Sequence, residues 1–142
     1  METIALGPFA VTPDGALAPL AADPAPALRF AWRGRACRAE VAADGLRLAA
    51  DAARIPSTAE PGADRRRAFA AVARLPAHLP SGWRARLLPD HRLRLEASAP
   101  LAAPANATAL VASLVRFVLA LDPYLDSLEA AGVAWPPGTS RT

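Results

Sequence analysis

The stretch 28-LRFAWRGRACRAEVAADGLRLAA-50 decides the fold, because apolar and polar side chains alternate through most of it. Leu28, Phe30 and Trp32 fall on one side of an extended chain, and more polar or smaller residues lie between them. A period of two residues predicts a strand with one buried face. Asp44-Gly45 is a favoured two-residue hairpin turn. The stretch therefore predicts three consecutive antiparallel strands.

Two more strands are expected further along the chain. Trp83–Leu87 alternates apolar residues with arginines, and Arg92–Ala97 alternates again after a turn at Pro89–His91. Near the start, Phe9–Leu17 contains Pro-Asp-Gly, a combination typical of turns, and predicts a short hairpin. A proline-rich irregular linker is expected at 19–26.

The helices are expected at 64–75 and 106–121. The first should turn Phe69 and Val72 inward, and Asn106 or Thr108 can cap the second by accepting a bond from a free backbone N–H. Asp122-Pro123 is typical of a cap followed by the first residue of a helix. We therefore expect either a kink there or a short second helix, Pro123 to Ala131, that ends at Gly132.

Together these elements predict an α+β fold. It has an antiparallel sheet of about five strands with two main helices packed on one face, in the order β-β-β-α-β-β-α. With 142 residues the chain fits a single domain, expected at 1–133 and followed by a flexible tail at 134–142.

Composition indicates a cytoplasmic protein. Cys37 is the only cysteine, so an intramolecular disulfide is impossible, which agrees with a reducing compartment. The N-terminus lacks the features of a secretory leader. The longest apolar stretch covers about 12 residues, against the roughly 20 of a membrane span, so we expect no membrane association.

All sixteen basic residues are arginines, and the formal net charge is +3. If the apolar alternates of the strands face the core, one open sheet face carries Arg29, Arg33, Arg38, Arg47, Arg84, Arg86, Arg92 and Arg94. Such a face can serve only to keep the sheet soluble, can bind an acidic protein, or can bind nucleic acid through its phosphates. As candidate partner-binding residues on this face we select Arg38, Arg47, Arg84, Arg86 and Arg94.

The last long helix is apolar over much of its circumference. Leu114, Phe117 and Val118 lie within its apolar stripe, and we select them as candidate partner-binding residues. An apolar surface larger than one small sheet can cover indicates an interface, such as that of a homodimer. The alternative is that helix 64–75 covers the remainder.

No residue pattern indicates catalysis, a cofactor or a metal. His78 and His91 lack a second ligand at metal spacing, and Cys37 falls on the inward phase of its strand, as expected for a buried structural thiol. Asp122 and Asp126 share a helix face, and we interpret them as capping and solvent-exposed. We therefore expect the protein not to be an enzyme.

The element order resembles the type III secretion chaperone-like fold, which is also that of the bacterial YbjN-like proteins. The hairpin Arg35–Ala50, helix Asp64–Leu75, hairpin Trp83–Ala97 and helix Asn106–Leu121 carry the resemblance. It implies a homodimer that binds another polypeptide without catalytic residues. The chain differs from secretion chaperones in being basic and in lacking an N-terminal helix.

Two functions therefore stay open from the sequence. The first is a non-catalytic, chaperone-like or scaffolding domain, a homodimer that binds a protein segment. The second is a domain that binds nucleic acid or another polyanion through the arginine face. The first predicts a dimer that is indifferent to salt, whereas the second predicts binding that weakens steeply as salt rises.

Overall fold

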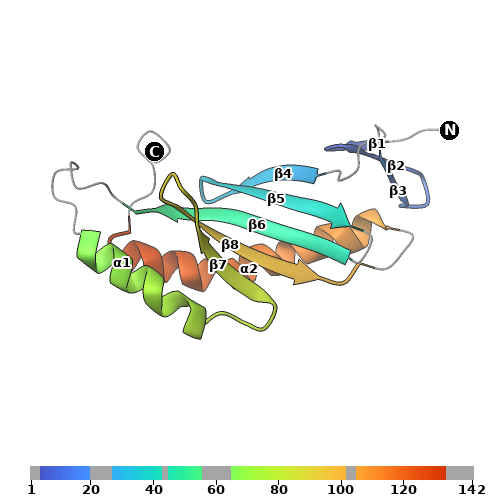
Figure 1. Cartoon of the computed structure of the whole chain (residues 1–142). Helices are drawn as coiled ribbons and strands as arrows, with labels where there is room; N and C mark the ends of the chain where they lie inside the picture. The colour runs from blue at the N-terminus through green and yellow to red at the C-terminus, as the bar shows by residue number, and fades with distance from the viewer. Residues whose placement is uncertain (1–3, 20–26, 43–44, 56–64, 102–104, 134–142) are drawn as a thin grey trace.

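A five-stranded antiparallel sheet forms the centre of the computed structural model, which describes residues 4–19, 27–42, 45–55, 65–101 and 105–133 (Figure 1). Its strands are β4 (Ala27–Trp32), β5 (Arg35–Ala42), β6 (Gly45–Arg54), β7 (Trp83–Leu87) and β8 (Arg92–Ala99). They lie in the order β4-β5-β6-β8-β7. The α+β class and the five-stranded sheet expected from the sequence are thus confirmed.

Three hairpins and one return connection produce this order. The β4–β5 turn is Arg33-Gly34, with φ of 51° and 81°, the left-handed geometry of a two-residue hairpin loop. At the β5–β6 turn, Ala42 pairs with Gly45; the predicted turn residue Asp44 lies outside the described residues. The chain leaves β6, forms a helix, and returns as β7, so that the next hairpin places β8 beside β6.

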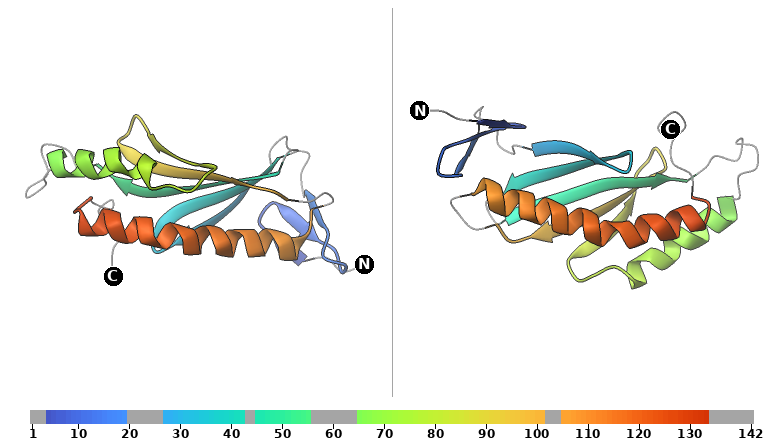
Figure 2. Two further views of the ribbon diagram at one scale, coloured as in Figure 1. Left: turned by 90° about the horizontal axis from the view of Figure 1, so that it is seen from below. Right: turned by 180° about the vertical axis from the view of Figure 1, so that it is seen from behind.

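Both helices cover the same face of this sheet (Figure 2). They are α1 (Arg65–Arg74), which continues into the short 3-10 helix η1 (Leu75–Ala77), and α2 (Ala107–Ala130). Ala68, Ala71 and Leu75 of the first helical segment are buried, whereas Phe69 is 39% exposed, so its predicted inward orientation is wrong. Asn106 caps α2, as predicted, by accepting bonds from the backbone N–H groups of Thr108 and Ala109.

The predicted break at Pro123 is wrong, because α2 runs through this residue as one helix of 24 residues. Proline removes one N–H donor and usually kinks a helix. Here Asp122 and Asp126, on either side of Pro123, both contact Arg33, so tertiary contacts stabilise the helix on both sides of the proline. The predicted end at Gly132 is confirmed: its φ is 75°, and Val133 N–H donates to the carbonyl of Leu128.

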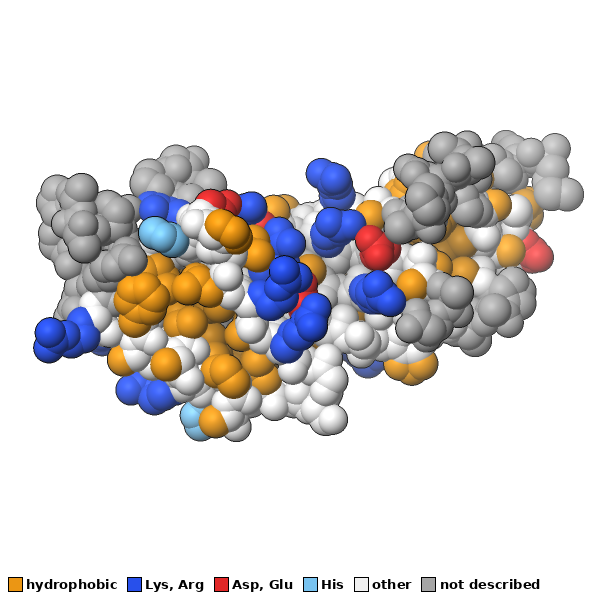
Figure 3. All heavy atoms as spheres, viewed as in Figure 1, with side chains coloured by type: hydrophobic (Ala, Val, Ile, Leu, Met, Phe, Trp, Pro, Cys, Tyr) orange, Lys and Arg blue, Asp and Glu red, His pale blue; other side chains and the backbone are white. Residues whose placement is uncertain are grey.

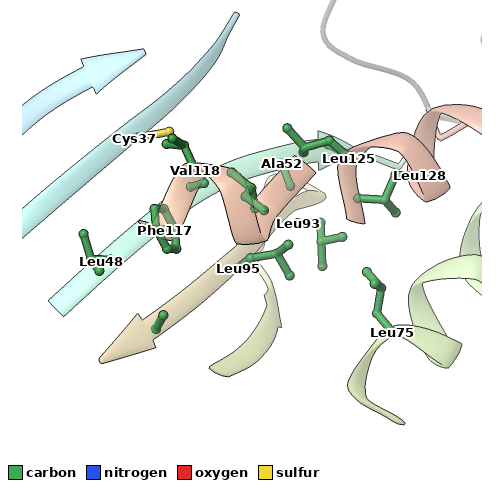
Figure 4. Close-up of a cluster of buried hydrophobic side chains, with 14 of the residues drawn as sticks. Cys37, Leu48, Ala52, Leu75, Leu93, Leu95, Phe117, Val118, Leu125 and Leu128 are labelled. Carbon is green, nitrogen blue, oxygen red and sulfur yellow. The ribbon is translucent and has the colours of Figure 1, made fainter. Parts of the chain in front are cut away.

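The core lies between the sheet and the helices (Figure 4). The helices contribute Phe117, Val118, Leu121, Leu125, Leu128 and Leu75, and β8 contributes Leu93 and Leu95. Facing them, β5 and β6 present mainly alanines, of which Ala39, Ala50 and Ala52 have no exposed surface. These small side chains let α2 approach the sheet closely.

The N-terminal segment forms a separate three-stranded antiparallel sheet. Its strands are β1 (Ile4–Leu6), β2 (Phe9–Val11) and β3 (Leu17–Pro19), in that order. This sheet contains the expected hairpin as β2 and β3 and adds one strand before it. It contacts the start of α2, where Ala107 N–H donates to the carbonyl of Gly15 and Leu17 N–H donates to that of Ala105. The rest of the expected linker, 20–26, lies outside the described residues.

Candidate functional site

The sheet face opposite the helices carries a hollow of about 640 Å³. Basic side chains gather over the middle of the sheet, with acidic ones among them (Figure 3). The charged residues that line the hollow are Arg38, Glu40, Arg47, Arg84, Arg86, Arg94 and Glu96. Arginines therefore outnumber carboxylates by three, and all five arginines selected from the sequence meet in one place. We call this surface the arginine hollow.

The register of the strands explains why a hollow forms there. On β6, the middle strand of the sheet, Ala49 lies opposite Arg38 of β5 and opposite Glu96 of β8. Side chains directly opposite one another point to the same face of a sheet. The methyl group of Ala49 leaves space between the long side chains of Arg38 and Glu96, and the arginines around it form the walls.

Glu96 connects two arginines of the edge strand β7. Arg84 Nε lies 2.5 Å from Glu96 Oε1, and Arg86 Nη1 lies 3.1 Å from Glu96 Oε2. The Glu96 side chain is only 19% exposed, whereas those of Arg84 and Arg86 are 70% and 51% exposed. One carboxylate therefore serves two guanidinium groups, each of which carries five N–H donors.

Two further arginines of the hollow, Arg38 and Arg94, each pair with one carboxylate. Arg38 Nη2 donates to Glu40 at 2.9 Å. Arg94 Nε donates to the buried Asp51 at 2.8 Å, and this hydrogen bond raises the pKa of Arg94. Arg92, which was also expected on this face, pairs with Asp51 at 2.7 Å. Asp51 thus fixes the side chains of Arg92 and Arg94, whereas Arg84 and Arg86 on the edge strand are exposed.

Arg33 was expected on the same face, and this prediction is wrong. It stands in the β4–β5 turn and contacts α2 on the helix side of the sheet. A salt-bridge cluster forms there, which we call the clasp; its members are Trp32, Arg33, Arg35, Asp122, Asp126 and Glu129. The capping role expected for Asp122 is wrong, because α2 runs through this residue. Asp126 is exposed, as expected, but both carboxylates also pair with Arg33, at 3.2 and 3.0 Å.

Sequence reasoning missed two members of the clasp, Arg35 and Glu129. Arg35 is buried, and its Nη2 donates to Glu129 Oε2 at 2.7 Å. Its Nε donates to the carbonyl of Ala52 at 3.2 Å, which fixes the side chain against β6. The spacing of Asp122, Asp126 and Glu129 at i, i+4 and i+7 was the available signal, because it places three carboxylates on one helix face.

The exposed apolar surface of α2 consists of other residues than those selected from the sequence. Phe117 and Val118 are 3% and 7% exposed and point into the core (Figure 4), and Leu114 is half-buried against it, so these selections are corrected. The exposed apolar residues follow one another at intervals of four: Val111, Val115 and Leu119. We call them the outer stripe. By length and composition α2 could also cross a membrane, a test that the core helix of a soluble protein passes as well.

Two kinds of candidate group remain, the thiol of Cys37 and clusters of potential metal ligands. Cys37 is buried, as expected, and burial raises the pKa of its thiol to about 11. A thiol in that state is a poor nucleophile near neutral pH. Within the described residues, no group of three or more His, Cys, Asp or Glu side chains could hold a metal ion.

The chain was also compared with known proteins. No family model, no curated protein and no solved structure matches it. Functional inference therefore rests on the arginine hollow, the clasp and the outer stripe.

Proposed function

We propose that this protein is a non-catalytic binding domain that receives an acidic segment of another protein in the arginine hollow. The observation that carries the proposal is the hollow itself, in which five arginines face two glutamates around the small Ala49. Exposed guanidinium groups pair with carboxylates in a bidentate manner. Each guanidinium group carries five N–H donors, so Arg38, Arg84 and Arg86 keep donors beyond those that pair with Glu40 and Glu96.

The positions of the aromatic rings favour protein over nucleic acid as the ligand. Single-stranded nucleic acid is commonly held by stacking of bases on exposed aromatic rings. Trp83 belongs to the lining of the hollow, but its ring packs on Phe117 and Tyr124, with centroid distances of 5.1 and 5.9 Å. Phe30 and Trp32 pack against the core. Within the described chain, the hollow therefore offers charge without a stacking platform.

A chaperone-like or scaffolding role, as a homodimer, agrees with the resemblance in element order. In this proposal the second copy binds at the outer stripe (Val111, Val115, Leu119), which is separate from the arginine hollow. Helix α2 covers one face of the sheet (Figure 2), and the side chains that line the hollow belong to the other face. A dimer formed in this way leaves both hollows open to acidic partners.

Fluorescence anisotropy tests the proposal with two probes, a labelled glutamate-rich peptide and single-stranded DNA of matched charge. The variant R84A/R86A removes two arginines of the hollow. R66A/R74A is the matched control, since it removes two exposed arginines of α1. We expect the peptide to bind, and R84A/R86A to bind it about tenfold more weakly than the control does.

Two results would overturn the proposal. Tighter binding of DNA than of peptide, with a steep loss as salt rises, would identify a polyanion-binding face. Equal peptide affinity in R84A/R86A and R66A/R74A would mean that the arginines only keep the sheet soluble.

A further inference from the structure

Glu96 occupies donors that an acidic ligand would need. It lies in the wall of the arginine hollow and accepts from both Arg84 and Arg86. A ligand carboxylate that approaches these two arginines meets the negative charge of Glu96 at the same place. Whether the ligand displaces Glu96 or binds next to it, the charge of Glu96 opposes binding.

We propose that Glu96 is an internal competitor for the ligand and thereby determines the specificity of the arginine hollow. The proposal rests on the proposed function, since it concerns the same site. A single ligand carboxylate that takes the place of Glu96 exchanges one ion pair for another and gains little. A ligand with several neighbouring carboxylates also uses the remaining donors of Arg38, Arg84 and Arg86. The hollow therefore selects clustered acidic residues over isolated ones.

Glu96 fits this role better than the other carboxylates of the face. Asp51 is buried and pairs with both Arg92 and Arg94, so its pairs are costly to break. Glu40 pairs with Arg38, which lies on β5 across Ala49 from Glu96. The pairs of Glu96 involve Arg84 and Arg86, whose side chains are 70% and 51% exposed, and exposed ion pairs contribute only about 0–1 kcal/mol. They can exchange for ligand contacts at small cost.

The variant E96Q tests the inference, because glutamine keeps the shape and the accepting oxygen but removes the charge. D126N is the matched control: it also removes one negative charge, at an exposed carboxylate on α2, away from the hollow. Two labelled peptides serve as probes, one with clustered glutamates and one with a single glutamate. We expect E96Q to bind the clustered peptide about fivefold more tightly than D126N does. The single-glutamate peptide should gain by a larger factor.

Equal or weaker binding of the clustered peptide by E96Q than by D126N would overturn the inference. E96D keeps the charge and should retain the preference of the wild type for the clustered peptide; loss of that preference would also contradict the role of the charge. Failure of the proposed function looks different, since the wild-type protein would then bind no better than R84A/R86A. Thermal melting curves show that each variant is folded before binding is compared.

Discussion

Trp32 Nε1 donates a 2.7 Å hydrogen bond to Asp122 Oδ1, and this bond connects the β4–β5 hairpin to α2 across 90 positions of the sequence. The same carboxylate oxygen accepts from Arg33 Nη1 at 3.2 Å. Asp122 is the residue before Pro123, where α2 is weakest in its own hydrogen bonding. The clasp thus supports the helix where it is most easily bent.

Replacing Trp32 by Phe should lower the stability of the fold. Phenylalanine keeps most of the apolar ring but removes the N–H donor, so Asp122 loses one of its partners. Urea denaturation followed by circular dichroism should show a lower midpoint with an unchanged slope. Y124F, which removes a bond from Tyr124 Oη to the exposed His78 carbonyl, is the control and should change the midpoint less. Equal midpoints for W32F and the wild type would contradict the role of the bond.

Acid should weaken the clasp. The hydrogen bond from Trp32 and then that from Arg33 hold the pKa of Asp122 below its ordinary value of 3.8. A carboxylate whose folded pKa is lowered stabilises the fold above its unfolded pKa, and this contribution disappears as pH falls through the folded pKa. We therefore expect D122N to be less stable than the wild type at neutral pH. Urea midpoints should converge as pH falls below about 4; a constant difference at every pH would contradict the assignment.

Cys37 should resist thiol reagents in the folded protein. Burial raises its pKa to about 11 from 9.0, so its thiolate fraction at neutral pH is about one hundredth of that of an ordinary thiol, before steric protection is considered. Labelling with Ellman's reagent should be slow in buffer and fast in denaturing urea. Rapid labelling in buffer would show that β5 opens or that the thiol is accessible.

The outer stripe should control self-association. We expect the wild-type protein to be a dimer in size-exclusion chromatography with light scattering, and V115D to be a monomer with a similar melting temperature, since Val115 is 48% exposed. F117A should instead destabilise the fold by about 3–5 kcal/mol, because it empties a core site. A wild-type monomer would exclude the homodimer.

Filling the arginine hollow should block the ligand without any change in charge. A49L places a large side chain at the centre of the hollow, whereas A36L places the same side chain at an exposed position of β5 outside the lining. Peptide binding should fall at least about tenfold in A49L and stay near wild type in A36L. If both variants bind like the wild type, binding depends on general surface charge and not on the hollow.

Prediction from the sequence succeeded where the two-residue period of a strand decides on which face of the sheet a side chain lies. Alternation placed Arg38, Arg47 and Arg84 on one face before the strand order was known, because a strand turns successive side chains to opposite faces whatever its neighbour. It failed for Arg33, whose direction depends on a left-handed turn residue instead of on a strand. The same limit hid the contact between Arg35 and Glu129, since it joins segments that only the tertiary fold brings together.

Helix α2 shows a second limit of sequence reasoning. Its residues are apolar on almost every side, so periodicity alone did not distinguish the face toward the sheet, with Phe117 and Val118, from the outer stripe. At Pro123 the local preference predicted a break, and contacts of Asp122 and Asp126 with the hairpin overrode it. Packing against residues distant in the sequence decides both which face of α2 is buried and whether the helix continues through Pro123. A local sequence pattern carries no information about such packing.

The buried alanines of β5 and β6 determine which substitutions the core can tolerate at the sheet. Ala39, Ala50 and Ala52 have no exposed surface and almost nothing left to truncate, so substitutions there are mostly enlargements that force α2 away from the sheet. Leu121, Leu125 and Leu128 on the helix are fully packed large residues, and there truncation leaves cavities. These alanines and these leucines therefore tolerate opposite kinds of substitution, and one of the alanines can be enlarged only if a neighbouring leucine becomes smaller with it. Leu93 and Leu95 of β8, which are also fully buried, resist truncation as the helix leucines do.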